Sequence, residues 1–256
     1  MEERKKDSRL AVLIDADNVP YANIKEMMEE IAKNGTPTIK RIYADWTKPT
    51  VSGWKNVLLE NAINPIQQYS YTSGKNSSDS ALIIDAMDIL YTGKVDGFCI
   101  VSSDSDFTRL ATRLRESGMI VIGIGEKKTP TPFITACDKF IYIEILKKPQ
   151  EIVKPLAAKP TQNKNTKATH KEKAIPPTNY SLWKLISESV SDLADDSGWT
   201  FLADLGNFIL KKKPDFDPRN YGFTKMLPLI KSLEKFEIDE RITGVNNTRH
   251  IFIKNK

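Results

Sequence analysis

The chain has few residues that could form cross-links or bind soft metals. Its 256 residues include only two cysteines and two histidines. Cys99 and Cys137 both stand in apolar stretches, which indicates small core residues in a reducing compartment rather than a disulfide framework. No set of histidines and cysteines has the spacing of zinc ligands, so the sequence argues against a zinc site.

Long apolar runs are also absent. The N-terminal segment Met-Glu-Glu-Arg-Lys-Lys is too charged for a secretory signal peptide. No apolar stretch approaches the roughly 20 residues that a membrane-spanning helix needs. We therefore expect a soluble, cytoplasmic protein with no membrane partner.

Positive charge is concentrated in one segment, although the net charge of the whole chain is only +5. Residues 147–177 contain eight lysines against two glutamates, together with five prolines and no periodic apolar pattern. This composition predicts a basic, flexible linker, and its charge would also attract nucleic acid. The linker separates an N-terminal domain, residues 1–146, from a C-terminal domain, residues 178–256.

The N-terminal domain alternates short apolar runs with amphipathic stretches. We expect strands at 10–14, 38–43, 64–69, 97–102, 119–124 and 140–145. Helices are expected between them at 18–33, 52–61, 79–91, 106–117 and 132–137. Strands that alternate with helices predict an α/β fold, a Rossmann-like parallel sheet covered by helices on both faces.

Aspartates stand where these strands end or helices begin. Asp15 follows the run 10–14, Asp79 opens a helix, and Asp104 and Asp106 follow the strand at 97–102; Asp138, before the last strand, is the weakest case. Carboxylates gathered at the carboxyl edge of a sheet repel one another unless a cation neutralises them. Oxygen ligands favour Mg²⁺ or Mn²⁺, so the pattern predicts a metal-dependent enzyme acting on phosphate esters.

Helix capping is the ordinary explanation for any one of these aspartates, because Asp is a favoured cap residue. Capping does not explain Asp15, which ends an apolar strand. We therefore expect Asp15, Asp79, Asp104 and Asp106 to be catalytic residues that bind one or two metal ions, with Asn18 orienting a carboxylate or a water.

Three segments of residues 10–145 together resemble the NYN family of PIN-like ribonuclease domains. They are Leu-Ile-Asp-Ala-Asp-Asn, which ends at Asn18, Lys-Asn-Ser-Ser-Asp-Ser-Ala-Leu around Asp79, and Val-Ser-Ser-Asp-Ser-Asp-Phe around Asp104. The resemblance implies a PIN-like fold and a Mg²⁺- or Mn²⁺-dependent endoribonuclease. It assigns the same four aspartates to metal binding and catalysis, with Asn18 beside them.

Two alternatives remain open. The segment Asp15-Ala-Asp17-Asn-Val19 also fits the D-x-D-x-V pattern of haloacid-dehalogenase-like phosphatases, but their later Ser/Thr and Lys have no natural counterpart here and Asp79 stays unexplained. A non-catalytic RNA-binding or scaffold protein that retains the fold is the second alternative. The sequence also leaves open whether DNA is a substrate.

An RNA-cleaving site with an acidic centre needs cations for the flanking phosphates. The candidates in the N-terminal domain are Lys75, before Asp79, and Arg109 and Arg113 on the helix after Asp106. Arginines at this spacing also commonly form a solvated face. Trp46 and Tyr71 are candidates for stacking on bases, with core or rim packing as the alternative.

In the C-terminal domain the apolar pattern predicts three helices, at 180–193, 201–210 and 220–233, followed by strands at 236–242 and 249–253. Three helices followed by two strands indicate a small α+β winged helix. Its segments Gly-Trp-Thr-Phe-Leu-Ala-Asp-Leu-Gly, ending at Gly206, and Asn-Tyr-Gly-Phe, ending at Phe223, resemble the OST-HTH/LOTUS domain. The resemblance implies RNA binding, or in some members protein binding, and a homo-oligomer also stays open. The candidate phosphate contacts are Lys211, Lys212, Lys213, Arg219 and Lys225.

Overall fold

The computed structural model describes residues 7–69, 77–146, 177–243 and 248–256. Their contacts divide the chain into two compact units, Met1–Lys147 with Leu210–Gly222, and Lys148–Ile209 with Phe223–Lys256. The predicted basic linker lies outside the described residues apart from residue 177, and Lys75 and Tyr71 lie outside them as well. No helix in the described part of the chain is long and apolar enough to cross a membrane.

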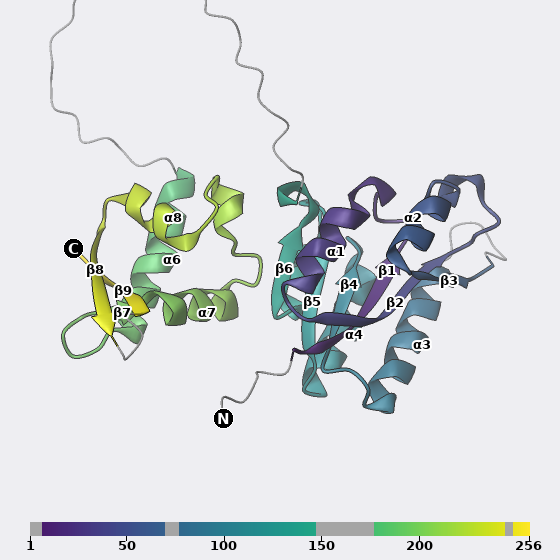
Figure 1. The fold of residues 1–256 in the computed structure, drawn as a ribbon, viewed down its shortest axis with the longest axis horizontal. Helices are drawn as coiled ribbons and strands as arrows, with labels where there is room; N and C mark the ends of the chain where they lie inside the picture. Colours follow the sequence, from purple (N-terminus) through teal and green to yellow (C-terminus); the bar gives the residue numbers. More distant parts are fainter. Residues whose placement is uncertain (1–6, 70–76, 147–176, 244–247) are drawn as a thin grey trace, which may run out of the picture. The chain divides into compact units, whose positions relative to one another are not determined.

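A six-stranded parallel sheet forms the centre of the first unit (Figure 1). The strands are β1 (Arg9–Asp15), β2 (Thr36–Ala44), β3 (Asn64–Gln67), β4 (Gly97–Val101), β5 (Ile120–Gly125) and β6 (Lys139–Tyr142). Their order across the sheet is β3-β2-β1-β4-β5-β6, and every neighbouring pair is parallel. The central strands β1 and β4 are apolar along nearly their whole length because both of their faces are buried.

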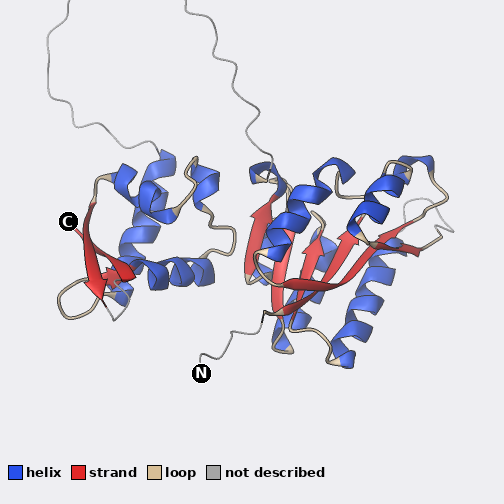
Figure 2. Cartoon of the chain, viewed as in Figure 1, coloured by secondary structure: helices blue, strands red, loops and turns tan. Residues whose placement is uncertain are grey.

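Helices cover both faces of this sheet (Figures 1 and 2). Side chains of α1 (Ile24–Ala32) and α2 (Trp54–Asn61) share one buried cluster with Leu10, Val12 and Ile14 of β1. Side chains of α3 (Ser77–Thr92), α4 (Thr108–Glu116) and α5 (Thr131–Ala136) share a second cluster with Ala11 and Leu13. Alternate residues of one strand therefore serve two cores, as the period of a strand requires.

The strand order reverses between β1 and β4. From β1 the chain proceeds outward to β2 and β3, then returns through α3 to β4 and proceeds outward on the other side to β5 and β6. In open parallel sheets of this kind the crevice at such a reversal, at the carboxyl ends of the strands, is where ligands bind. Asp15 is the last residue of β1, and Ser102 follows the last residue of β4.

The C-terminal elements are α6 (Pro177–Leu193), β7 (Thr200–Phe201), α7 (Leu202–Lys212), a 3₁₀ turn η5 (Pro218–Tyr221), α8 (Met226–Leu233), β8 (Phe236–Thr243) and β9 (Thr248–Asn255). The strands form an antiparallel sheet in the order β7-β9-β8. The Asn255 side chain on β9 donates to the Ser187 carbonyl and the Ser191 hydroxyl, 3.0 Å each, which fixes this sheet to α6. The predicted fold class is thus confirmed: a parallel α/β sheet and a small helical domain with a three-stranded sheet.

Several predicted elements differ in extent. The helix expected at 18–33 begins as a 3₁₀ turn, Tyr21–Asn23, and becomes α1 only at Ile24. Phe201, expected to start a helix, belongs to β7. The helix expected at 220–233 is broken, because Gly222 adopts the left-handed conformation (φ 83°) after η5 and α8 starts only at Met226. The strand expected at 140–145 ends at Tyr142 and continues as a 3₁₀ turn, Ile143–Ile145.

Candidate metal centre

Asp15 is a buried carboxylate held in a fixed orientation. Its exposed fraction is 1 %. Oδ2 accepts hydrogen bonds from the Asn18 amide at 2.7 Å and the Ser102 hydroxyl at 2.8 Å, and Oδ1 accepts the Asp17 backbone N–H at 3.1 Å. Burial raises the pKa of Asp15 above its usual range, while these three hydrogen bonds oppose the rise.

The loop after β4 places two more carboxylates above the same strand ends. The Ser102 hydroxyl that donates to Asp15 also accepts the Asp104 backbone N–H at 3.1 Å. The Asp104 carboxylate accepts the Asp106 backbone N–H at 2.9 Å and thereby caps the 3₁₀ turn η3 (Ser105–Phe107), which leads into α4. The capping explanation therefore holds for Asp104, but it uses only one lone pair of that carboxylate.

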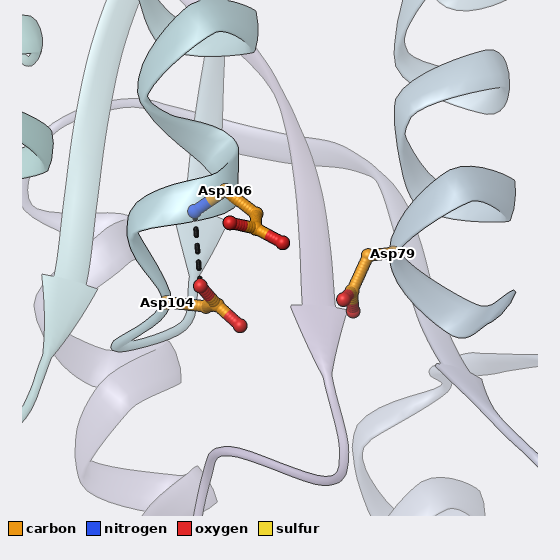
Figure 3. A group of neighbouring side chains, drawn as sticks. All are labelled: Asp79, Asp104 and Asp106. Carbon is orange, nitrogen blue, oxygen red and sulfur yellow. Dashed lines mark hydrogen bonds between the residues drawn. The ribbon is translucent and has the colours of Figure 1, made fainter. Parts of the chain in front are cut away.

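Asp79 completes a group of three carboxylates with Asp104 and Asp106. One oxygen from each of the three lies within 4.8 Å of the other two. Figure 3 shows Asp79, from the first turn of α3, facing the two aspartates that precede α4. We call Asp79, Asp104 and Asp106 the acidic triad; it has the spacing of ligands around one cation, and its donor atoms are all oxygens.

The pKa of Asp79 reflects the repulsion between the carboxylates gathered at this site. Asp79 has an exposed fraction of only 7 %. Burial, together with repulsion from neighbouring carboxylates such as Asp15, Asp104 and Asp106, raises the pKa of Asp79 to about 6. A divalent cation would relieve this repulsion, so the residues fit a metal of the Mg²⁺ or Mn²⁺ type.

The other aspartates considered from the sequence lie outside this group. Asp17 is exposed, and among the described residues its carboxylate accepts a long 3.5 Å hydrogen bond from the Ser78 hydroxyl. Asp138 precedes β6, so it lies at the amino edge of the sheet, opposite the triad. There it accepts the Val121 backbone N–H and pairs with Arg115 at 2.9 Å. These two contacts account for its position in the fold.

The cationic residues predicted for RNA contact are mostly exposed. Arg109 and Arg113 both lie on the solvent side of α4, and the Arg113 guanidinium donates to the Ser117 hydroxyl at 3.1 Å. Lys211 and Lys212 are exposed at the end of α7, Lys213 is half-buried, and exposed Lys225 precedes α8. Arg219 differs, because its guanidinium is already paired with the Asp217 carboxylate at 2.7 Å.

Ser102 is a site residue that the sequence reasoning missed. It is fully buried and links β1 to β4, since its single hydroxyl serves both Asp15 and the backbone of Asp104. The register of β1 against β4 brings the two side chains together. Ile14 pairs with Val101, so the residues that follow them, Asp15 and Ser102, are neighbours at the strand ends.

Comparisons with known proteins identify two domain families in the chain. The NYN domain family matches residues 9–144, more than half of the chain, and the OST-HTH/LOTUS domain family matches residues 182–248. Among curated proteins none matches. The haloacid-dehalogenase-like phosphatase pattern gives Asp79 no role, whereas in the structure Asp79 is a member of the acidic triad. This position of Asp79 disfavours the phosphatase alternative.

Solved structures resemble parts of the chain, and three of them show the extent of the likeness. A protein of unknown function from Vibrio parahaemolyticus is 20 % identical over 55 % of this chain and 96 % of its own, with a TM-score of 0.45. An uncharacterised Nitrosomonas europaea protein is 25 % identical over 40 % of this chain and 92 % of its own, with a TM-score of 0.27. A Chromobacterium violaceum protein is 30 % identical over 29 % of this chain and 78 % of its own, with a TM-score of 0.25. TM-scores this low carry no argument about function.

Proposed function

The chain belongs to the NYN domain family, and we propose that it is a metal-dependent endoribonuclease that hydrolyses phosphodiester bonds of RNA. The observation that carries the proposal is the acidic triad at the point where the strand order reverses, with the pKa of Asp79 raised to about 6. Three carboxylates with oxygens within 4.8 Å of one another have the spacing of ligands around a divalent cation, and a raised pKa in such a group is typical of functional sites.

Asp79, Asp104 and Asp106 would hold the ion, which we propose to be Mg²⁺ or Mn²⁺. A bound divalent cation supplies charge that stabilises the phosphate oxygens and makes a bound water more acidic. Water attack on phosphorus needs no nucleophilic side chain, which is consistent with a site built from carboxylates alone.

Asp15 is proposed as the fourth ligand, and its hydrogen bonds determine what it can offer. A carboxylate has about four lone-pair sites, and three are used by Asn18, Ser102 and the Asp17 backbone. The hydrogen bonds between described residues therefore leave one lone pair of Asp15, on Oδ1, for a metal ion. Asn18 and Ser102 are thus positioning residues, which keep that oxygen at the reversal of the strand order.

The cations proposed for the RNA strand lie beyond the triad. Arg109 and Arg113 are exposed on α4, which starts directly after the loop that carries Asp106. Lys75 precedes Asp79 in the chain. The OST-HTH/LOTUS domain suggests nucleic-acid binding, and within it we propose Lys211, Lys212, Lys213 and Lys225 as phosphate contacts. Arg219, the fifth residue predicted from the sequence, pairs with Asp217 at 2.7 Å and with Glu30 at 2.8 Å, so we propose no phosphate contact for it.

Replacement of Asp104 by Asn separates catalysis from binding. The change keeps the side-chain shape and removes one of the three charges in the triad. Cleavage of a labelled single-stranded RNA by the full chain with Mn²⁺ should fall by at least a hundredfold, while RNA affinity stays equal or rises slightly. An Asp104→Asn chain that cleaves like the wild type would contradict the assignment. A wild-type chain that binds RNA but never cleaves it would favour the non-catalytic RNA-binding alternative.

A further inference from the structure

A pocket of about 700 Å³ lies beside α2 and the edge strand β3, and the metal centre does not use it. The residues that line it include buried Leu58 and Ile63. They also include Trp46, Lys48, Lys55 and Gln67, which we call the pocket rim. This volume is within the range of pockets that enclose a small ligand.

The pocket rim and the acidic triad share one edge of the sheet. Tyr43 of β2 is paired in register with Asp15 of β1, and Trp46 comes only three residues later. Gln67, also at the rim, is the last residue of β3, the neighbour of β2. Asp15 and Gln67 end their strands and Trp46 follows the end of β2, so all three lie at the carboxyl edge of the sheet. A strand of RNA lying across the triad toward β3 would meet this rim.

The aromatic ring at the rim is held in place. The indole N–H of Trp46 donates to the Ile66 carbonyl at 2.9 Å, and its backbone N–H donates to the Gln67 side chain at 3.0 Å. Gln67 in turn donates to the buried Asp45 carboxylate at 3.1 Å. A ring fixed in this way loses little conformational freedom when a flat group stacks on it.

The two lysines of the rim favour a ligand that carries a negative charge. Lys48 and Lys55 are both exposed, and none of the ten residues that line the pocket, all of them described, is acidic. An apolar pocket with an aromatic wall and two cations suits a group that joins a flat ring to an anion. A nucleotide within an RNA strand has that composition.

A peptide added to the exposed edge of β3 would be the other occupant, but β3 is a poor template for it. The strand has only four residues, and Pro65 lacks a backbone N–H. Backbone pairing along this edge is therefore weak, whereas stacking and phosphate pairing do not need it.

We propose that this pocket binds a nucleobase of the RNA substrate next to the scissile phosphodiester, with Trp46 stacking on the base and Lys48 and Lys55 pairing with the neighbouring phosphates. The proposal rests on the proposed endoribonuclease function and adds to it a subsite that would determine where the enzyme holds its substrate. Trp46 and the lysines are binding residues and take no part in the chemical step.

The test is the affinity of the full chain for a fluorescent single-stranded RNA 12-mer in EDTA, measured by anisotropy at several salt concentrations. Trp46→Ala should weaken binding about tenfold, since one base–aromatic stack is lost. Trp46→Phe should restore most of the affinity. Lys55→Glu should weaken binding and lower the salt slope by about 0.7, the value for one phosphate of a single strand.

Lys94→Glu is the matched control, because Lys94 is also exposed but precedes β4 at the opposite edge of the sheet. It should leave affinity and salt slope unchanged. Lys55 and Lys94 are solvent-exposed, so their replacement tests the proposal even if Trp46→Ala disturbs folding. Wild-type affinity in both Trp46→Ala and Lys55→Glu would overturn the proposal and would point instead to a protein segment as the occupant.

RNA cleavage distinguishes this outcome from failure of the proposed function. Cleavage by the wild type with unchanged RNA affinity in the pocket variants refutes the pocket alone. Affinity that depends on Trp46 in a chain that never cleaves RNA refutes the endoribonuclease function and keeps the pocket as an RNA-binding site.

Discussion

Replacing Asp79 by Asn should stabilise the metal-free protein, although it damages the proposed metal site. Burial and the four neighbouring carboxylates of Asp15, Asp104, Asp106 and Asp17 raise the pKa of Asp79 from 3.8 to about 6. A pKa that rises by one corresponds to about 1.36 kcal/mol, so the ionised carboxylate costs the folded state roughly 3 kcal/mol. The asparagine side chain carries no charge and would avoid that cost.

The sign of the pH dependence follows from linkage. Because the folded state binds this proton more tightly than the unfolded state, the stability of the wild type falls as the pH rises from about 4 to about 6. The difference in unfolding free energy between Asp79→Asn and wild type should therefore be small at pH 4 and reach about 2–3 kcal/mol at pH 7.

Urea unfolding in EDTA measures this difference, with hydrogen exchange of the β1 amides as the probe that reports unfolding of the first unit. Asp88→Asn is the control, because Asp88 is an exposed carboxylate on the same helix and should show no such growth with pH. With Mn²⁺ the order should invert, since the ion stabilises only the intact triad. A difference between Asp79→Asn and wild type that stays flat from pH 4 to pH 7 would refute the reasoning about repulsion.

Three further predictions follow from single contacts. Ser102→Ala removes a 2.8 Å hydrogen bond to buried Asp15, so the unfolding free energy at pH 7 should fall by about 2 kcal/mol in urea titrations and RNA cleavage should slow. Gly123→Ala would place a Cβ 2.5 Å from the Phe140 ring, and a loss of about 1–3 kcal/mol in the same titrations is expected. Arg109→Ala should lower the salt slope of single-stranded RNA binding by about 0.7, whereas an unchanged slope would exclude a phosphate contact.

The fold was largely predictable because its strands are buried on both faces. Segments such as residues 10–14 and 97–101 read as continuous apolar runs between amphipathic stretches, and the structure contains β1 and β4 there. The C-terminal break at Gly222 was not predicted, since Asn220–Leu233 keeps a helical apolar spacing and only the backbone reveals the left-handed residue. The local sequence pattern thus predicted which helices and strands are present better than it predicted where each begins and ends.

The site was predictable only in part, because the sequence does not give the order of strands. That Asp79 meets Asp104 and Asp106 depends on α3 crossing back to the reversal between β1 and β4. The same lack of topology left Asp138 in consideration, although it lies at the other edge of the sheet. The link through Ser102 needed the register of β1 against β4, and the pocket at Trp46 needed side-chain packing.

The most direct test of the central proposal is cleavage of a labelled single-stranded RNA by the full chain with Mn²⁺, Mg²⁺ or EDTA, comparing wild type, Asp15→Asn and the control Asp88→Asn. The proposal predicts cleavage by the wild type and the control that needs the divalent ion and is lost in Asp15→Asn. Cleavage that persists in EDTA, or in Asp15→Asn at the wild-type rate, would contradict a metal-dependent site built on these carboxylates.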